Sequence, residues 1–132
     1  MTTRTSKTTL GIAVVLLLVI GAIHFVDARD AWGDAHYKGV LFFANGFGSL
    51  LAALGVALGV RTWGWGLGLL ISASTALGYI LSRTVGLPGL PAEPDKWFEP
   101  LGIASFMAEV AFASLAIWVL WPSRGERIRS HS

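Results

Sequence analysis

The most constraining feature of this sequence is a set of four long apolar runs, each close to the length that crosses a membrane. They cover about residues 9–27, 38–60, 62–82 and 100–121. A helical span needs roughly 20 mainly apolar residues for a hydrocarbon core of about 30 Å. Because the runs are continuous and not alternating, they predict helices rather than the strands of a membrane barrel. We therefore expect an all-α integral membrane protein, a four-helix bundle with antiparallel up-down topology.

The segments between the runs are polar or rich in proline. We expect loops at residues 28–37, which carry several charges, and at 83–99, where Pro88, Pro91 and Pro94 forbid a continuous helix. Arg61 and Thr62 form a very short link between the second and third runs. The composition agrees, since only 14% of residues are charged, against about 25% in a soluble domain. The absence of cysteine excludes disulfides and thiolate zinc sites. The 132 residues are expected to form one membrane domain.

The distribution of lysine and arginine favours an orientation with both termini in the cytoplasm of a plasma-membrane protein. The inner side then holds Arg4, Lys7, Arg61, Arg124, Arg127 and Arg129, and the outer side holds Arg29, Lys38, Arg83 and Lys96. The pI of about 9.4 is explained by a basic tail at 124–129 beside anionic lipid and not by nucleic-acid binding. The first run also has the features of a signal peptide, with a cleavage site near Val26–Ala28, but an uncleaved span is favoured.

Small and aromatic residues predict how the spans pack. GxxxG motifs at 55–59 and 64–68 indicate close contact between antiparallel second and third helices, with homodimerisation as the alternative. The tryptophans are expected to lie in the two interfacial belts. Trp63, Trp65, Trp118 and Trp121 would mark the inner belt, and Trp32 and Trp97 the outer belt.

Glu109 is the one charged residue that lies deep within a predicted span. It is about nine residues into the fourth run, near the bilayer centre. An acid at this depth costs about 2.5–3.5 kcal/mol on insertion scales, so it faces the protein interior and has a partner. A functional interpretation makes Glu109 a proton relay, an ion ligand or a cofactor contact. A structural interpretation makes it a hydrogen-bonded link between helices.

A second group of candidates surrounds the first predicted loop. Asp27 lies three residues after His24 on the same helix face, where it could orient or charge the imidazole. His24 could bind a metal or haem iron or shuttle protons. A mixed donor set for zinc, copper or manganese is also conceivable, although its spacing matches no defined motif. That set is His24, Asp27, Asp30, Asp34 and His36.

Three further polar residues complete the candidate site. Asn45, on the second helix, would form a small buried network if it faced Glu109. Arg83 closes the third helix and could reach the headgroups or pair with Glu99 or Asp27, beneath an ordered loop over the outer mouth. Glu99 precedes Pro100, where a carboxylate complements the dipole of the fourth helix.

Two segments carry a family resemblance. Ser82-Arg-Thr-Val-Gly-Leu-Pro-Gly89, followed by Trp97-Phe-Glu-Pro100 and Glu109, resembles uncharacterised four-span membrane proteins of actinobacteria. The similarity covers most of the chain. It implies four spans and an ordered outer loop, and it carries over no catalytic residue.

The sequence contains no phosphate loop, nucleophile elbow, dinucleotide fingerprint or HExxH motif, so a non-enzymatic role is favoured over an enzymatic one. The favoured hypothesis is an accessory or structural subunit of a larger membrane complex, and two alternatives stay open. The second is a binding or transfer protein whose outer polar pocket holds an ion, haem, quinone or lipid headgroup. The third is a proton or ion pathway, alone or as a homo-oligomer. The cofactor is not specified by any of these patterns.

Overall fold

The structure, a computed structural model, describes residues 6–122 and is all-helical within them. Its four long helices are α1 (Lys7–Asp34), α2 (His36–Ala57), α3 (Leu67–Thr84) and α4 (Pro100–Leu120). A π-helix, η2 (Arg61–Gly66), precedes α3, and a short 3-10 helix, η3 (Pro94–Lys96), precedes α4. All four helices, with η2 counted as part of the third, are long and apolar enough to cross a membrane, as the sequence predicted. The basic tail at 124–129 lies outside the described residues.

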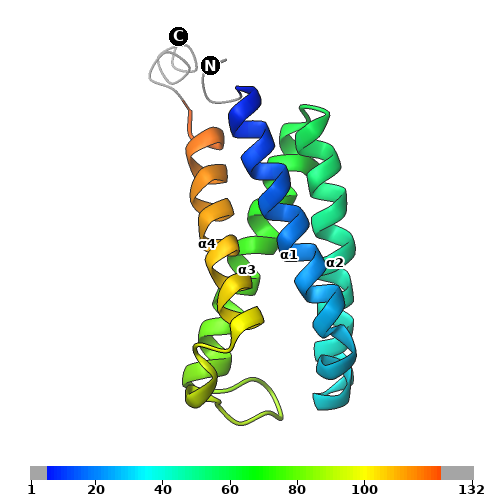
Figure 1. Cartoon of the computed structure of the whole chain (residues 1–132), viewed down its shortest axis with the longest axis vertical. Coiled ribbons are helices and arrows are strands. Elements are labelled where there is room, and N and C mark those ends of the chain that lie inside the picture. Colours follow the sequence, from blue (N-terminus) through cyan, green and yellow to red (C-terminus); the bar gives the residue numbers. More distant parts are fainter. Residues whose placement is uncertain (1–5, 123–132) are drawn as a thin grey trace.

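The helices lie side by side, and the two ends of the molecule differ in what they contain (Figure 1). The start of α1, the end of α4 and η2 lie at one end, which we call the η2 end. The junction of α1 with α2 and the segment 85–99 lie at the other end, which we call the loop end. Contacts join α1 to α2 and α4, and α3 to α2 and α4. In Figure 1, α1 and α4 diverge toward the loop end.

The loop predicted at residues 28–37 is wrong, because α1 continues to Asp34 and only Ala35 separates it from α2. This segment has charges but no proline, and charges do not break a helix once it has left the hydrocarbon. A helix of 28 residues is about 42 Å long, whereas the hydrocarbon core is about 30 Å thick. The ion pair between Lys38 Nζ and Asp34 Oδ2, 3.0 Å apart, bridges the junction. The acidic residues of the expected loop therefore lie on the last turns of α1.

The predicted close contact between the second and third spans is confirmed at Gly55 and Gly64. A Cβ added to either glycine would come within 2.6 Å of backbone atoms of the other. The second glycine of each motif has another role. Gly59, with φ of 79°, ends α2, where Val60 N–H donates to Gly55 O at 2.8 Å. Gly68 leaves room for the ring of Phe112.

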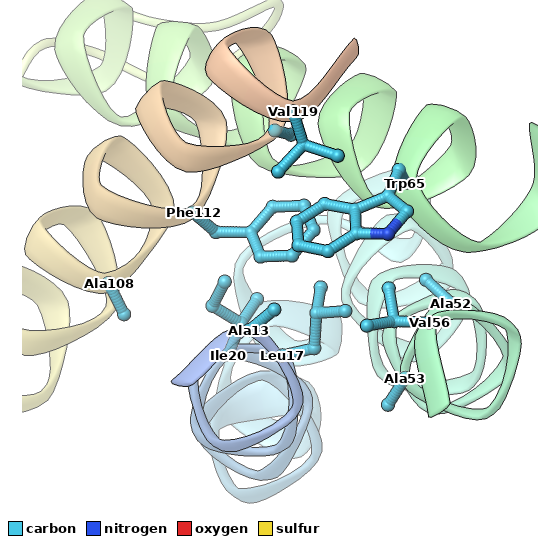
Figure 2. Close-up of a cluster of buried hydrophobic side chains, with 11 residues drawn as sticks. Ala13, Leu17, Ile20, Ala52, Ala53, Val56, Trp65, Ala108, Phe112 and Val119 are labelled. Carbon is cyan, nitrogen blue, oxygen red and sulfur yellow. The ribbon is translucent and has the colours of Figure 1, made fainter. Parts of the chain in front are cut away.

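Apolar side chains fill the η2 half of the molecule (Figure 2). We call this group the apolar cluster, and it consists of Ala13, Leu17, Ile20, Ala52, Ala53, Val56, Trp65, Ala108, Phe112, Ala116 and Val119. Trp65 is 1% exposed and stacks on Phe112, with ring centroids 5.7 Å apart. The expectation that Trp65 belongs to an interfacial belt is therefore wrong. The wide turn of η2 directs it inward, whereas Trp63, two residues earlier, stays exposed.

The segment 85–99 is ordered by turns and by contacts to neighbouring helices. Leu87 and Leu90 exchange two backbone hydrogen bonds around Pro88 and Gly89. Gly89 has φ of 74°, as the third position of a type II turn requires. The tip of this turn reaches α2, where Tyr37 Oη donates to Pro88 O. The segment thus lies across the loop end, in agreement with the ordered loop predicted from the sequence.

Candidate functional site

A cavity of about 840 Å³ lies at the loop end, between all four helices and the segment 85–99. Small-molecule sites are typically about 300–1,000 Å³. All six residues singled out as binding candidates line this cavity, although they are spread from α1 to α4. They are His24, Asp27, Asn45, Arg83, Glu99 and Glu109.

The deepest part of the cavity holds a buried carboxyl group beside a buried imidazole. Glu109 is 1% exposed and His24 is 4% exposed. Ser105 Oγ donates a hydrogen bond of 2.6 Å to Glu109 Oε2. His24 Nε2 lies 3.8 Å from the same oxygen. Glu109 therefore joins α4 to α1 and also faces the cavity.

The backbone of α1 fixes the orientation of the His24 ring. His24 Nδ1 lies 2.8 Å from Ile20 O. A carbonyl oxygen only accepts, so Nδ1 carries a proton and the neutral imidazole turns the lone pair of Nε2 toward Glu109. Transfer of one proton from Glu109 to His24 would convert a carboxylic acid and a neutral imidazole into a carboxylate and an imidazolium. The pair can donate or accept a hydrogen bond to a bound group.

Asn45 lines the wall of the cavity and bonds to residues other than Glu109. Its Nδ2 donates to Thr75 Oγ1 at 2.9 Å, and its Oδ1 accepts from Ser49 Oγ at 3.1 Å. Asn45 thus forms a hydrogen-bonded link from α2 to α3 and does not bond Glu109. The bond between Ser49 and Asn45, in contrast, lies within one face of α2, because the two residues are four positions apart.

Arg83 is a buried cation, 8% exposed, that is held mainly by neutral groups. Its Nε donates to Lys96 O at 3.2 Å and its Nη1 to Ser82 Oγ at 3.0 Å. The guanidinium carbon lies 4.3 Å from the centre of the Tyr79 ring, a distance at which the ring face attracts a cation. Within residues 6–122, Arg83 does not form the ion pair with Glu99 or Asp27 that was one of the two alternatives, because the segment 85–99 brings backbone oxygen to it instead.

Two of the carboxylates that line the cavity are already paired with lysine. Asp34 bonds Lys38, and Glu93 Oε2 lies 2.7 Å from Lys96 Nζ. The hydrogen bond and charge of Glu93 raise the pKa of Lys96 above its ordinary value. Each lysine of the cavity lining thus has one carboxylate partner, and at longer range Lys38 also attracts Asp27 and Lys96 also attracts Glu99.

Three other carboxylates gather at the mouth of the cavity without such a partner. They belong to Asp27, Asp30 and Glu99, and the last two are close enough to Asp27 to repel its charge. In the described part of the chain, none of the three has a cation within 4.0 Å. Glu99 precedes α4, as predicted, but its side chain forms no capping hydrogen bond. We call Asp27, Asp30 and Glu99 the acidic rim.

The mixed metal set expected from the sequence is not brought together. Among residues 6–122, no group of three or more histidine, aspartate or glutamate side chains is placed to hold a metal ion. His24 faces Glu109, whereas His36 stacks on Trp32 with ring centroids 4.3 Å apart. The helical conformation of residues 24–34 spreads these side chains along α1 by about 1.5 Å per residue.

Aromatic residues of the cavity were missed in the sequence analysis. Tyr37, Phe42 and Tyr79 all line it, and Phe42 lies 4.9 Å from the His24 ring, centre to centre. Tyr79 could have been found, since it is four residues before Arg83 on the same face of α3. The position of Phe42 depends on how α1 packs on α2, which the apolar pattern does not specify.

Comparisons with protein-family models, with curated proteins and with solved structures find no match to this chain. The site is therefore interpreted from its own geometry. It combines the acidic rim, a buried arginine and a buried carboxyl–imidazole pair. Such a cavity can bind a molecule with more than one polar group.

Proposed function

We propose that this chain is a multi-pass protein of the plasma membrane whose cavity binds the polar head of an amphiphilic molecule. In this proposal the helices form an antiparallel up-down bundle with both termini in the cytoplasm. The loop end then faces outward, and the cavity opens at the outer surface. The excess of lysine and arginine on the opposite side supports this orientation.

The observation that carries the proposal is the convergence of six polar candidates, from His24 to Glu109, on one cavity. Polar and charged groups are expensive within a membrane and normally mark a site that uses them. An accessory or structural subunit packs through its outer surface and needs no polar interior. The cavity therefore favours a binding or transfer function over an accessory one.

The lining of the cavity explains why the ligand is expected to be amphiphilic. Ile23, Leu41, Phe42 and Ile71 contribute apolar wall next to the polar groups. Leu41 is also exposed on the outside of α2, where the bilayer would lie. A ligand with an apolar chain can remain in lipid while its head occupies the cavity.

Filling the cavity tests this function. Gly78 lines it, and a Cβ added there meets nothing within 4 Å, so Gly78→Phe places a ring in the cavity without a backbone clash. The full-length chain, purified from native membranes in mild detergent, is expected to retain a ligand that native mass spectrometry detects. Gly78→Phe should lower the retained fraction by at least about tenfold, equivalent to 1.4 kcal/mol of binding free energy.

Gly11→Phe is the matched control. Gly11 is also a helical glycine with open space at its Cβ, but it lies on α1 outside the cavity lining. The control should retain as much ligand as the unmodified chain. Equal retention by Gly78→Phe and Gly11→Phe would show that any bound molecule lies outside the cavity, and the proposal would be wrong.

A further inference from the structure

Resting on the proposed function, we infer that the ligand is zwitterionic, with an anionic phosphate or carboxylate group on Arg83 and an ammonium group at the acidic rim. Some charged side chains of the cavity lining have no ion-pair partner of opposite charge in the described part of the chain. With the two lysines of the lining paired, Arg83 is the remaining cation, and the rim carboxylates are the remaining outer anions.

Arg83 has a free hydrogen-bonding position in the cavity. Its Nε and Nη1 donate to Lys96 O and Ser82 Oγ, but within residues 6–122 its Nη2 has no hydrogen-bond partner. The side chain is 92% buried, since it is 8% exposed, and it lines the cavity. A buried cation without a counter-charge is costly. An anionic group that accepts from Nη2 supplies both the missing charge and the missing hydrogen bond.

Arg83 Nη2 lies against the first turn of α4. A Cβ added to Gly102 would come 3.2 Å from Nη2 and 3.1 Å from the Tyr79 ring. Gly102 therefore lets the guanidinium and the ring pack closely on the start of α4. It lies in the first turn of α4, where backbone N–H groups and the helix dipole favour negative charge. An anionic group in the cavity that accepts from Nη2 thus also lies near the start of α4.

The rim indicates that the ligand also carries positive charge. Asp27, Asp30 and Glu99 would repel a purely anionic molecule at the mouth. Glu99 precedes Gly102 by three residues, slightly less than one helical turn, which places it about 4.5 Å further out along the axis of α4. An ammonium group four bonds from the phosphorus or the carboxyl carbon, as in phosphoethanolamine, spans such a separation. The outer carboxylates and the inner guanidinium thus match a head whose ammonium group faces water.

Two sources can supply this chemistry, namely the headgroup of a phospholipid and a soluble zwitterion such as phosphoethanolamine. The test places the full-length chain in nanodiscs of equal parts phosphatidylethanolamine and phosphatidylglycerol, and native mass spectrometry then measures which lipid stays bound. We expect the zwitterionic lipid to be retained in preference by at least about tenfold, equivalent to 1.4 kcal/mol. Retention of no lipid together with displaceable binding of phosphoethanolamine would support the zwitterionic site but overturn the amphiphilic ligand of the proposed function.

Substitutions test separately the binding of the anionic group at Arg83 and of the ammonium group at the acidic rim. Arg83→Lys keeps the charge but removes Nη2, and it should weaken retention of both lipids. The double substitution Asp27→Asn, Glu99→Gln should abolish the preference for phosphatidylethanolamine while phosphatidylglycerol is still bound. Arg61→Gln and Asp95→Asn are the matched controls, because neither residue lines the cavity, and both should leave the preference unchanged. Circular dichroism of Arg83→Lys confirms that a loss of retention is not a loss of fold.

The outcomes distinguish this inference from the proposed function. Equal retention of the two lipids, or retention of phosphatidylglycerol alone, would overturn the zwitterionic assignment, even if Gly78→Phe still displaced the bound lipid. Binding that survives Gly78→Phe would overturn the proposed function as well. Failure of both lipids and of phosphoethanolamine to bind would also overturn the inference.

Discussion

The η2 half of the molecule is filled by side chains, whereas the loop half encloses a cavity of about 840 Å³. In the η2 half, Gly55 and Gly64 bring two backbones into contact, and Trp65 fills the space between four helical segments. In the loop half, polar side chains line the cavity beside apolar ones, and several of them bond to backbone oxygen, as His24 and Arg83 do.

This difference has a physical origin in how membrane helices associate. Lipid is as apolar as leucine, so burial of apolar area gives helices little reason to associate, and close packing at small residues provides the attraction. The η2 half has these small residues, among them Ala13, Ala52 and Ala53. We therefore expect substitutions in the η2 half to change stability, and substitutions in the loop half to change binding.

The largest expected effect on stability is that of Phe112→Ala. Phe112 is fully buried and stacks on Trp65. Its removal should lower the free energy of unfolding by about 3–5 kcal/mol, as measured by denaturant titration in detergent micelles. Ligand retention by the fraction that remains folded should be unchanged. A loss below 1 kcal/mol, about the value of one buried methylene, would show that the apolar cluster does not hold the helices together.

Gly64→Ala should have the next largest effect. The new Cβ would meet the backbone of Gly55 and Val56 at 2.6 Å, so α2 and η2 must separate. Overpacking of this kind costs about 1–3 kcal/mol. Gly33→Ala is the control, because a Cβ at Gly33 meets nothing within 4 Å. The same denaturant titration applies, and equal stability of the two variants would contradict the close approach.

Ser72→Ala tests the boundary between the two halves and should stabilise the protein. Among the described residues, Ser72 Oγ is the buried side-chain oxygen or nitrogen without a hydrogen-bond partner. Its removal should raise the free energy of unfolding by about 1 kcal/mol. Ser49→Ala is the comparison, because Ser49 donates to Asn45 and its loss should destabilise. A destabilised Ser72→Ala would reveal a partner for that hydroxyl.

The smallest effect on stability is expected from Glu109→Gln. Glutamine keeps the volume and an oxygen that can accept from Ser105, so the free energy of unfolding should change by less than about 1 kcal/mol. Ligand retention should fall nevertheless, because the amide cannot exchange a proton with His24. A folded variant that binds as the unmodified chain does would assign Glu109 to packing alone.

The number and approximate position of the four long helices were predictable from apolar run length, and the start of α4 at Pro100 was predictable from the position of proline. The end of α1 was not, because its acidic residues Asp27 to Asp34 suit both a loop and a helix that extends into water. The inward position of Trp65 depends on the π-helical turn at Arg61–Gly66, which changes the helical register. No periodicity in so short a link specifies that turn.

For the site, the sequence identified the residues better than their partners. Glu109 was evident because a charge within a span needs an explanation, and Ser105 could have been found four residues earlier on the same face. The contact of Glu109 with His24 required the packing of α1 on α4. Arg83 was expected to reach the headgroups or to pair with a carboxylate, and it bonds Lys96 O instead because the segment 85–99 folds back onto α3.

The hydrogen bond from Tyr37 to Pro88 is too weak to act as a barrier to a molecule that would enter or leave the cavity in the proposed function. It connects α2 to the tip of the turn at Pro88 and Gly89, across the cavity mouth. A single hydrogen bond contributes only about 0.5–1.5 kcal/mol net, which is one to three times the thermal energy. Thermal fluctuations therefore break and reform it without disturbing the apolar cluster. The exchange of a bound molecule is consequently governed by its own contacts with the cavity, and the residence time becomes a direct measure of those contacts.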